Sequence, residues 1–191
     1  EDLPAPVLTP GTVVNVQYTS GTTGRPKGCL LDHAYWTTLG GSMLTEHPHL
    51  TSDDVLLTAQ PFHYVDPQWN VVAALMAGAH LVVLDGFHPS TFWSKVREHE
   101  VTYFYCLASM PVLLLKMPAD PADRDHRVRA VQCSAIPPAL HAALEERWGV
   151  PWTEAFGMTE TGADIRVGAE EHDDLVGSGS LGRPAAHREA R

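Results

Sequence analysis

Short apolar runs rich in β-branched and aromatic residues alternate along the chain with longer stretches of helical pattern. The short runs predict strands near residues 13–18, 55–59, 81–84, 102–106, 128–132 and 152–156. The stretches between them predict helices near residues 33–45, 67–77, 89–99, 109–117 and 137–148. This succession predicts an α/β fold with a mostly parallel sheet and helices packed on its faces. Ligands usually bind at the strand ends of such a sheet.

The remaining segments are less regular. Residues 118–127 are polar and contain proline, which predicts a linker between two elements. Residues 162–191 lose clear periodicity, and we expect loops with short strands there. The longest apolar stretch, residues 71–84, is interrupted by Gly78 and His80 and is shorter than the about 20 residues that a membrane-spanning helix needs. We therefore expect no membrane span.

The composition narrows the class of protein. A length of 191 residues with 44% hydrophobic content can bury the core of one domain, or of part of a larger one. Acidic residues outnumber basic ones by 23 to 13 without a basic run, which argues against nucleic acid as a partner. Cys29, Cys106 and Cys133 are odd in number and widely spaced, which argues against a disulfide framework or a zinc site. We therefore expect a reducing, cytoplasmic environment.

The most informative segment for chemistry is residues 18–28, which run Tyr-Thr-Ser-Gly-Thr-Thr-Gly-Arg-Pro-Lys-Gly. Hydroxyl donors, glycines that let backbone amides approach a ligand, and a lysine together suit a triphosphate or pyrophosphate. The candidate phosphate-binding residues are Thr19, Ser20, Gly21, Thr22, Thr23, Gly24 and Lys27.

The surroundings of this run predict a strand, a glycine-rich turn and a helix, because a strand precedes it and Asp32 can cap a helix after it. The run is not an ordinary P-loop, since Pro26 separates Gly24 from Lys27 and Gly28 follows the lysine. The alternative is a polar surface loop rich in turn-forming residues.

A second segment, residues 152–162, runs Trp-Thr-Glu-Ala-Phe-Gly-Met-Thr-Glu-Thr-Gly. It is similar to the Tyr-Gly-Met-Thr-Glu segment of the adenylate-forming superfamily, and residues 18–28 resemble the phosphate loop of the same superfamily. Acyl-CoA synthetases, aryl-CoA ligases, firefly luciferase and the adenylation domains of peptide synthetases belong to it. The two segments stand in the superfamily's order along the chain.

The resemblance implies that residues 18–28 cradle the β- and γ-phosphates of ATP. Glu160 can hold Mg²⁺ through a hard carboxylate oxygen, and Thr159 can donate to the α-phosphate as negative charge builds there. Phe156 stands where tyrosine is more common and keeps an aromatic face for adenine. The alternative makes Phe156 and Met158 core residues at the end of a strand. The expected nucleotide-binding residues of this segment are Ala155, Phe156, Gly157 and Thr159.

A third segment, residues 60–64, is similar to the Pro-Xaa-Phe-His segment that acyl-CoA synthetases place beside the acyl group and the α-phosphate. The similarity implies that His63 contacts the reacting carboxylate or adenylate, and it favours a plain carboxylic acid as substrate. A structural role is the alternative for His63. Asp66 lies near enough to keep an amino-acid substrate open.

Residues 131–137 occupy the place of a Gly-Gly-Ala-Pro-like turn whose backbone lines the adenine pocket in the superfamily. Ser134, Ala135 and Ile136 can still offer backbone groups to a nucleotide. Because glycine is missing from this turn, any positive φ there is costly.

The sequence at residues 92–93, 146–149 and 182–184 most resembles that of the crotonobetaine/carnitine-CoA ligase branch. The resemblance implies that the parent protein uses ATP and Mg²⁺ to convert a carboxylic acid into an acyl-adenylate, and then transfers the acyl group to coenzyme A. Residues 1–191 would be part of the large N-terminal AMP-binding domain, without the C-terminal domain that carries a catalytic lysine.

Two other functions stay open. One is a truncated, non-catalytic nucleotide-binding fragment, and we expect the isolated chain to be inactive. The other is the loading of an amino or aryl acid onto a carrier-protein thiol. The sequence leaves the acid and the oligomeric state open, with a homo-oligomer among the options.

Overall fold

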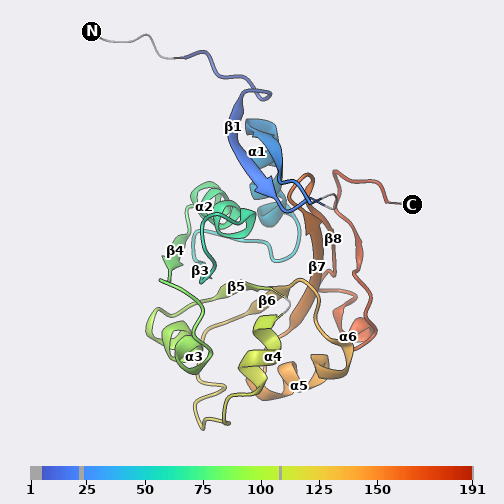
Figure 1. The fold of residues 1–191 in the computed structure, drawn as a ribbon. Coiled ribbons are helices and arrows are strands. Elements are labelled where there is room, and N and C mark those ends of the chain that lie inside the picture. Colours follow the sequence, from blue (N-terminus) through green and yellow to red (C-terminus); the bar gives the residue numbers. More distant parts are fainter. Residues whose placement is uncertain (1–5, 22–23, 108, 191) are drawn as a thin grey trace.

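A mostly parallel sheet forms the centre of the molecule (Figure 1). The computed structural model describes residues 6–21, 24–107 and 109–190. Within these residues the strands of the main sheet lie in the order β4 (His80–Val83), β3 (Val55–Thr58), β5 (Tyr103–Cys106), β6 (Ala130–Cys133), β7 (Trp152–Met158), β8 (Gly162–Arg166) and β9 (Arg183–Pro184). The first five are parallel, whereas β8 and β9 pair antiparallel. The predicted α/β fold with a mostly parallel sheet is confirmed.

Helices cover both faces of this sheet (Figure 1). The helices α1 (His33–Thr45) and α2 (Val65–Ala77) pack on one face, and α3 (Pro89–Glu98), α4 (Ser109–Leu115) and α5 (Pro138–Trp148) pack on the other. A short helix, α6 (His172–Leu175), lies in the C-terminal part of the chain.

The two apolar cores follow from the alternation of side chains along each strand. Leu56 and Tyr103 point to the face covered by α1 and α2, while their neighbours Leu57 and Phe104 point to the face covered by α3, α4 and α5. All four side chains are buried. Each such burial contributes about 1.5–3 kcal/mol, so continuous apolar runs in the sequence produce a sheet buried on both faces.

Capping residues place the helix ends where the sequence predicts them. Asp32 caps α1 through its carboxylate, which accepts a hydrogen bond from the Tyr35 backbone N–H at 2.8 Å. Gly78 and Gly149 end α2 and α5 in the left-handed conformation that glycine adopts without strain. The helix α2 begins at Val65, ahead of the predicted start at residue 67.

The predicted strand and the predicted helix at the N-terminus are confirmed, but the sequence missed an element between them. A second strand, β2 (Lys27–Asp32), follows the glycine-rich run and pairs antiparallel with β1 (Val13–Thr19). The two form a separate hairpin that projects from the body of the molecule (Figure 1). Within β2, Leu31 is 2% exposed and Leu30 is 68% exposed, the alternation of a half-buried strand. The sequence did not reveal this strand because it is short and α1 begins directly after it.

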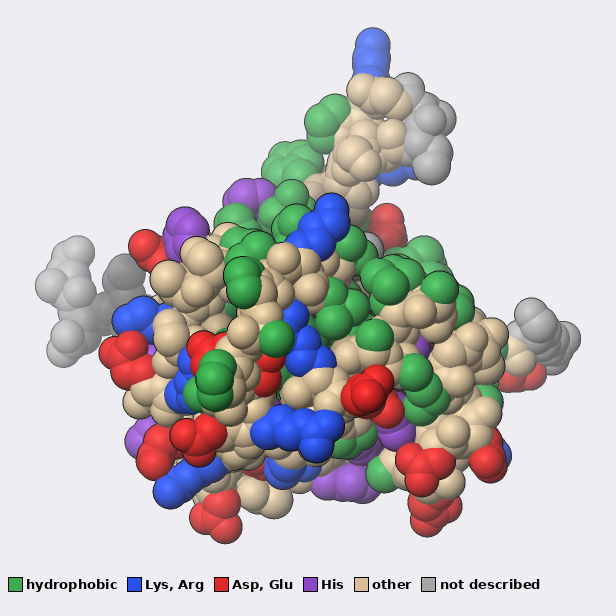
Figure 2. All heavy atoms as spheres, turned by 90° about the horizontal axis from the view of Figure 1, so that it is seen from below, with side chains coloured by type: hydrophobic (Ala, Val, Ile, Leu, Met, Phe, Trp, Pro, Cys, Tyr) green, Lys and Arg blue, Asp and Glu red, His purple; other side chains and the backbone are tan. Residues whose placement is uncertain are grey.

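The surface fits the dispersed charge of the sequence. Figure 2 shows acidic and basic side chains interspersed across one face of the molecule, with apolar side chains between them. Within the described ranges, the helices are too short or too polar to cross a bilayer.

Candidate active site

The glycine-rich run forms the tip of the β1–β2 hairpin. Thr19 and Lys27 face each other across the hairpin at the base of this tip. Gly21 has a φ of +64°, and a Cβ added there would lie 2.3 Å from the Arg25 carbonyl oxygen, so this position requires glycine. Ser20, Gly24 and Lys27 are exposed, as a ligand-binding tip requires. Thr22 and Thr23, also predicted to bind phosphate, lie outside the described residues.

The two separated tracts come together around Cys29 of β2. Burial raises the pKa of the Cys29 thiol, and the negative charge of Glu160 and a hydrogen bond to it add to this effect. The positive charge of Lys27 and a hydrogen bond with Thr19 lower the same pKa. Lys27 of the first tract and Glu160 of the second therefore lie close to one thiol. The raised pKa favours the protonated form of this thiol.

A cavity of about 260 Å³ lies beside this meeting point, between α1, α2 and the ends of β5, β6 and β7. It is lined by five of the residues predicted to bind nucleotide: Ser134, Ala155, Phe156, Gly157 and Thr159. Phe156 is 41% exposed, so its ring is available for stacking and is not a core residue. A Cβ on Gly157 would lie 2.0 Å from the Gly162 carbonyl oxygen, so only glycine allows the β7–β8 hairpin to close here.

The turn after β6 is held by a buried carboxylate. Glu154 of β7 accepts hydrogen bonds from the backbone N–H groups of Ala135, at 2.5 Å, and Ile136, at 2.9 Å. Ala135 has a φ of +66°, the costly conformation expected for a turn that lacks glycine. The Ser134 hydroxyl donates to the Ala155 carbonyl oxygen at 2.7 Å. Ser134 lines the cavity, but Ala135 and Ile136 do not, and the Ile136 side chain is buried in the core.

His63 is not among the residues that line the cavity. It is exposed and precedes the first turn of α2, and its backbone carbonyl accepts a hydrogen bond from the Gln17 side chain. Its ring lies against the Tyr64 ring, with 4.3 Å between the centroids. Val65 and Asp66, which follow this segment at the start of α2, line the cavity.

Tyr35, Trp69 and Tyr105 are among the cavity residues that were not predicted as ligands, and Asp66 was considered only as a possible partner of an amino-acid substrate. Asp66 and Trp69 are three positions apart on α2 and therefore share one face of the helix, a spacing visible in the sequence. Tyr105 lies near the carboxyl end of a parallel strand, where ligand-binding residues are common. Tyr35 gives no comparable signal, because its approach to the cavity depends on how α1 packs.

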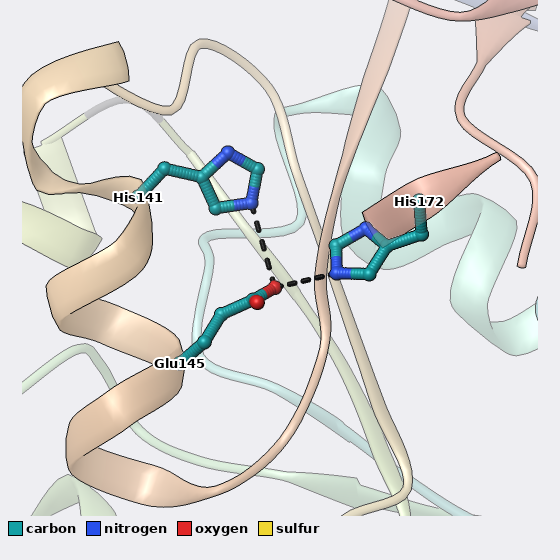
Figure 3. A group of neighbouring side chains, drawn as sticks. All are labelled: His141, Glu145 and His172. Atoms are coloured by element: carbon teal, nitrogen blue, oxygen red, sulfur yellow. Dashed lines mark hydrogen bonds and ion pairs between the residues drawn. The ribbon is translucent and has the colours of Figure 1, made fainter. Parts of the chain in front are cut away.

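A second cluster lies between α5 and α6 (Figure 3). Ligand atoms of His141, Glu145 and His172 lie within 4.8 Å of one another, a spacing that a metal ion could bridge. However, His141 Nδ1 accepts a hydrogen bond from the Gly177 backbone N–H at 3.1 Å, so its proton resides on Nε2. That Nε2–H donates to the Trp152 carbonyl oxygen at 2.6 Å and has no lone pair for a metal. The cluster therefore links α5 to α6 by hydrogen bonds.

The donor set around Glu160 fits Mg²⁺ and a polyphosphate. Carboxylate and hydroxyl oxygens are the hard ligands that Mg²⁺ prefers, and an ammonium group suits phosphate oxygens. Glu160 supplies the carboxylate, Thr19 the hydroxyl and Lys27 the ammonium group, and all three side chains influence the pKa of Cys29. The glycines at positions 21 and 157 allow the backbone to close tightly at these two turns, because a Cβ there would clash with a backbone carbonyl oxygen.

The chain is similar to known proteins both in sequence and in fold. The family model of the AMP-binding enzymes matches residues 1–191. The crotonobetaine/carnitine–CoA ligase of Salmonella typhi is 34% identical over 158 residues, which cover 82% of this chain and 30% of the ligase. The same ligase of Citrobacter koseri is 33% identical and covers 97% of this chain and 36% of its own length. The chain thus spans about a third of the length of these relatives.

A solved structure supports the fold. The o-succinylbenzoate CoA synthetase of Bacillus subtilis, in complex with ATP and magnesium ion, superposes with a TM-score of 0.82 at 23% identity. The match covers 97% of this chain and 38% of that one. With the family model covering all 191 residues and the fold matching as well, the chain belongs to the AMP-binding enzyme family.

Proposed function

We propose that the full-length protein containing this chain activates a carboxylic acid with ATP, releases pyrophosphate, and transfers the acyl group from the acyl-adenylate to coenzyme A. Residues 1–191 would form part of its AMP-binding domain. The observation that carries this proposal is the convergence of Lys27 and Glu160 on Cys29, beside the cavity lined by Phe156 and Thr159. The crotonobetaine/carnitine–CoA ligases among its relatives support a CoA thioester as the product.

Each part of the nucleotide has a candidate partner in this arrangement. Lys27 and the hydroxyls of the hairpin tip would hold the β- and γ-phosphates, and Phe156 would stack on adenine. Thr159 would donate to the α-phosphate, where negative charge builds as the carboxylate attacks. Mg²⁺ held by Glu160 would neutralise charge on the phosphates. The chain's contribution to the rate would be positioning and charge stabilisation, without a covalent intermediate on a side chain.

The turn at residues 134–136 and His63 have less direct parts in this proposal. The turn would border the adenine pocket through its backbone, which Glu154 holds in place. His63 would reach the reacting carboxylate only if its side chain turned from its exposed position toward the cavity.

Asp66 favours a second candidate within the same family. A carboxylate in the cavity suits the amino group of an amino acid, and an amino-acid substrate would be compatible with loading onto a carrier-protein thiol. Thiol consumption separates the two acceptors. Loss of free CoA thiol during turnover supports a CoA ligase, whereas adenylation with an unchanged thiol titre supports a carrier-protein acceptor.

ATP–pyrophosphate exchange in the full-length protein tests the adenylation step. We expect Lys27→Ala and Glu160→Ala each to lower the exchange rate by about 100-fold or more, as removal of a group that stabilises developing charge does. The matched controls are Lys95→Ala and Glu98→Ala, which remove the same side-chain types from a surface pair on α3. These controls should exchange at the wild-type rate.

Near wild-type exchange in both Lys27→Ala and Glu160→Ala would refute the proposed roles. Calorimetry with ATP and Mg²⁺ on the 191-residue chain distinguishes a non-catalytic fragment from an active one. Nucleotide binding without exchange would favour the fragment, and exchange by the chain itself would exclude it.

A further inference from the structure

We propose that the side chains of Asn15, Gln17 and Gln68 form an amide network that positions the tip of the β1–β2 hairpin against the turn before α2. Gln17 and Gln68 are then positioning residues for adenylation, although neither belongs to the tip or lines the cavity. The inference deepens the proposed function and rests on it, because the tip carries the groups assigned to the phosphates.

The hairpin needs such an anchor. In the part of the chain that the structure describes, it is a sheet of its own and projects from the body of the molecule (Figure 1). Backbone hydrogen bonds hold its base to α1, where the N–H groups of His33 and Ala34 donate to the carbonyl oxygens of Thr12 and Pro10. Because the hairpin does not pair with the main sheet, side-chain contacts must fix the position of its tip.

The strand β1 turns polar side chains toward the body of the molecule and apolar side chains away from it. Gln17 is 7% exposed, whereas Val16 and Tyr18 are 47% and 69% exposed. Asn15 is half-buried and shares the inward face with Gln17, because alternate residues of a strand point the same way. Burying an amide is unfavourable unless it is hydrogen-bonded, so the inward face depends on specific partners.

The first partners of this face lie on α1 and α2. Asn15 Oδ1 accepts a hydrogen bond from the Trp36 indole N–H of α1 at 3.0 Å. Asn15 Nδ2 donates to Gln68 Oε1 of α2 at 3.1 Å. One side chain of β1 thus bridges both helices that cover this face of the main sheet.

The network continues from Gln68 to the turn before α2. Gln68 Nε2 donates to Gln17 Oε1 at 2.9 Å and to the Phe62 carbonyl oxygen at 2.8 Å. The Gln17 amide in turn donates to the His63 carbonyl oxygen. The hairpin is therefore bonded to the backbone of the segment that contains His63.

The network has one satisfied arrangement. The Trp36 indole can only donate, and the backbone carbonyls at positions 62 and 63 can only accept. These ends determine which way each amide faces, because turning any one of them would set donor against donor and acceptor against acceptor. A fully bonded polar network therefore specifies one position of the hairpin, which an apolar contact of the same size would not do.

This anchor lies close to the groups that it would position. Gln17 pairs with Cys29 across the hairpin, and Lys27 lies two residues from Cys29 on the same face of β2. On the other side of the network, the turn leads into α2, where Asp66 lines the cavity. The network thus connects the phosphate-binding tip to the wall of the cavity.

The expected effect is on the rate of adenylation more than on binding. A displacement of about 1 Å between reacting groups can cost about 100-fold in rate. Without the network the hairpin can shift, but Lys27 and Phe156 remain available to the nucleotide. We therefore expect kcat to fall while KM for ATP changes little.

ATP–pyrophosphate exchange in the full-length protein tests this expectation. The acid is the one that the wild type activates fastest among butanoate, benzoate, 4-aminobutanoate and 4-(trimethylammonio)butanoate. Gln17→Met and Gln68→Met keep the length of the side chain and remove the amide. Each should lower kcat by about tenfold, with KM for ATP and for the acid within about threefold of the wild type.

The double variant tests whether the two residues act as one unit. Gln17→Met with Gln68→Met should also lose about tenfold in kcat, whereas independent effects would multiply to about 100-fold. Gln68→Glu keeps the size of the side chain but replaces the donor with a carboxylate oxygen, which faces two acceptors. It should be as slow as Gln68→Met.

Asn70→Leu is the matched control on the same helix. Asn70 is 1% exposed, and its amide donates to the Asp66 carbonyl oxygen at 2.7 Å, within α2. The substitution removes a buried amide without touching the hairpin. It should keep the wild-type kcat whatever its effect on urea unfolding.

The outcomes separate this inference from the proposed function. A kcat within about twofold of the wild type in Gln17→Met or Gln68→Met, or an equal loss in Asn70→Leu, would refute the positioning role and leave adenylation standing. Failure of both single variants to fold would also overturn it, because the network would then be purely structural. Absence of exchange by the wild type with all four acids would refute the proposed function, and the positioning role with it.

Discussion

Replacement of Ala135 by glycine should stabilise the protein, contrary to the usual effect of glycine. Ala135 has a φ of +66°, in the left-handed region where an L-residue with a Cβ loses about 1–2 kcal/mol. Its side chain is exposed, so the substitution removes no core packing. Glycine costs about 0.4–1 kcal/mol through the greater freedom of the unfolded chain. The difference predicts a net gain of about 0.5–1 kcal/mol in the free energy of unfolding.

Urea denaturation measures this gain directly. The slope of the unfolding free energy against urea concentration should be unchanged, and the midpoint should move to higher urea. The melting temperature should rise by about 1–4 °C for a domain of this size. Ala142→Gly is the matched control, because Ala142 is exposed in the middle of α5 and requires no positive φ. The control should lose about 1 kcal/mol. Destabilisation of Ala135→Gly by as much as the control would refute the strain at this turn.

The remaining predictions concern two carboxylates that anchor the fold. Glu145→Gln removes the negative charge of the carboxylate that accepts from His172 Nε2 at 2.6 Å and should cost about 2 kcal/mol in urea unfolding at pH 7, whereas the exposed Glu146→Gln should be neutral. Asp54→Asn leaves the Arg129 guanidinium, now 2.8 Å from the carboxylate, without its anionic partner and should also cost about 2 kcal/mol. A loss below about 0.5 kcal/mol would contradict this. Burial raises the pKa of both carboxyl groups, but their hydrogen bonds outweigh it and hold each pKa at about 2. Their contribution is therefore complete above the unfolded values of 3.8 and 4.5 and disappears as the pH falls toward 2, so equal stability at pH 5 and pH 2.5 would be inconsistent with these pairs.

Periodicity and capping in the sequence were sufficient to predict the sheet and its helices. The alternation that sends Leu56 and Leu57 to opposite faces is local, and so are the Asp32 cap and the glycine that ends α2. Such signals depend on residues a few positions apart and are visible without a structure. The same holds for the chemical character of residues 18–28 and 152–162, which pointed to one family.

Tertiary structure alone decided which residues meet. The strand β2 exists because it pairs with β1, and a pairing partner cannot be read from six residues. Glu154 shows its function only when β7 lies beside β6, where its carboxylate reaches the next turn. Asp66 and Tyr105 are far apart in the chain, and the packing of α2 over β5 brings them to one cavity. Local sequence thus determines the elements and their chemistry, whereas long-range packing determines the site, because contacts between distant residues depend on the whole fold.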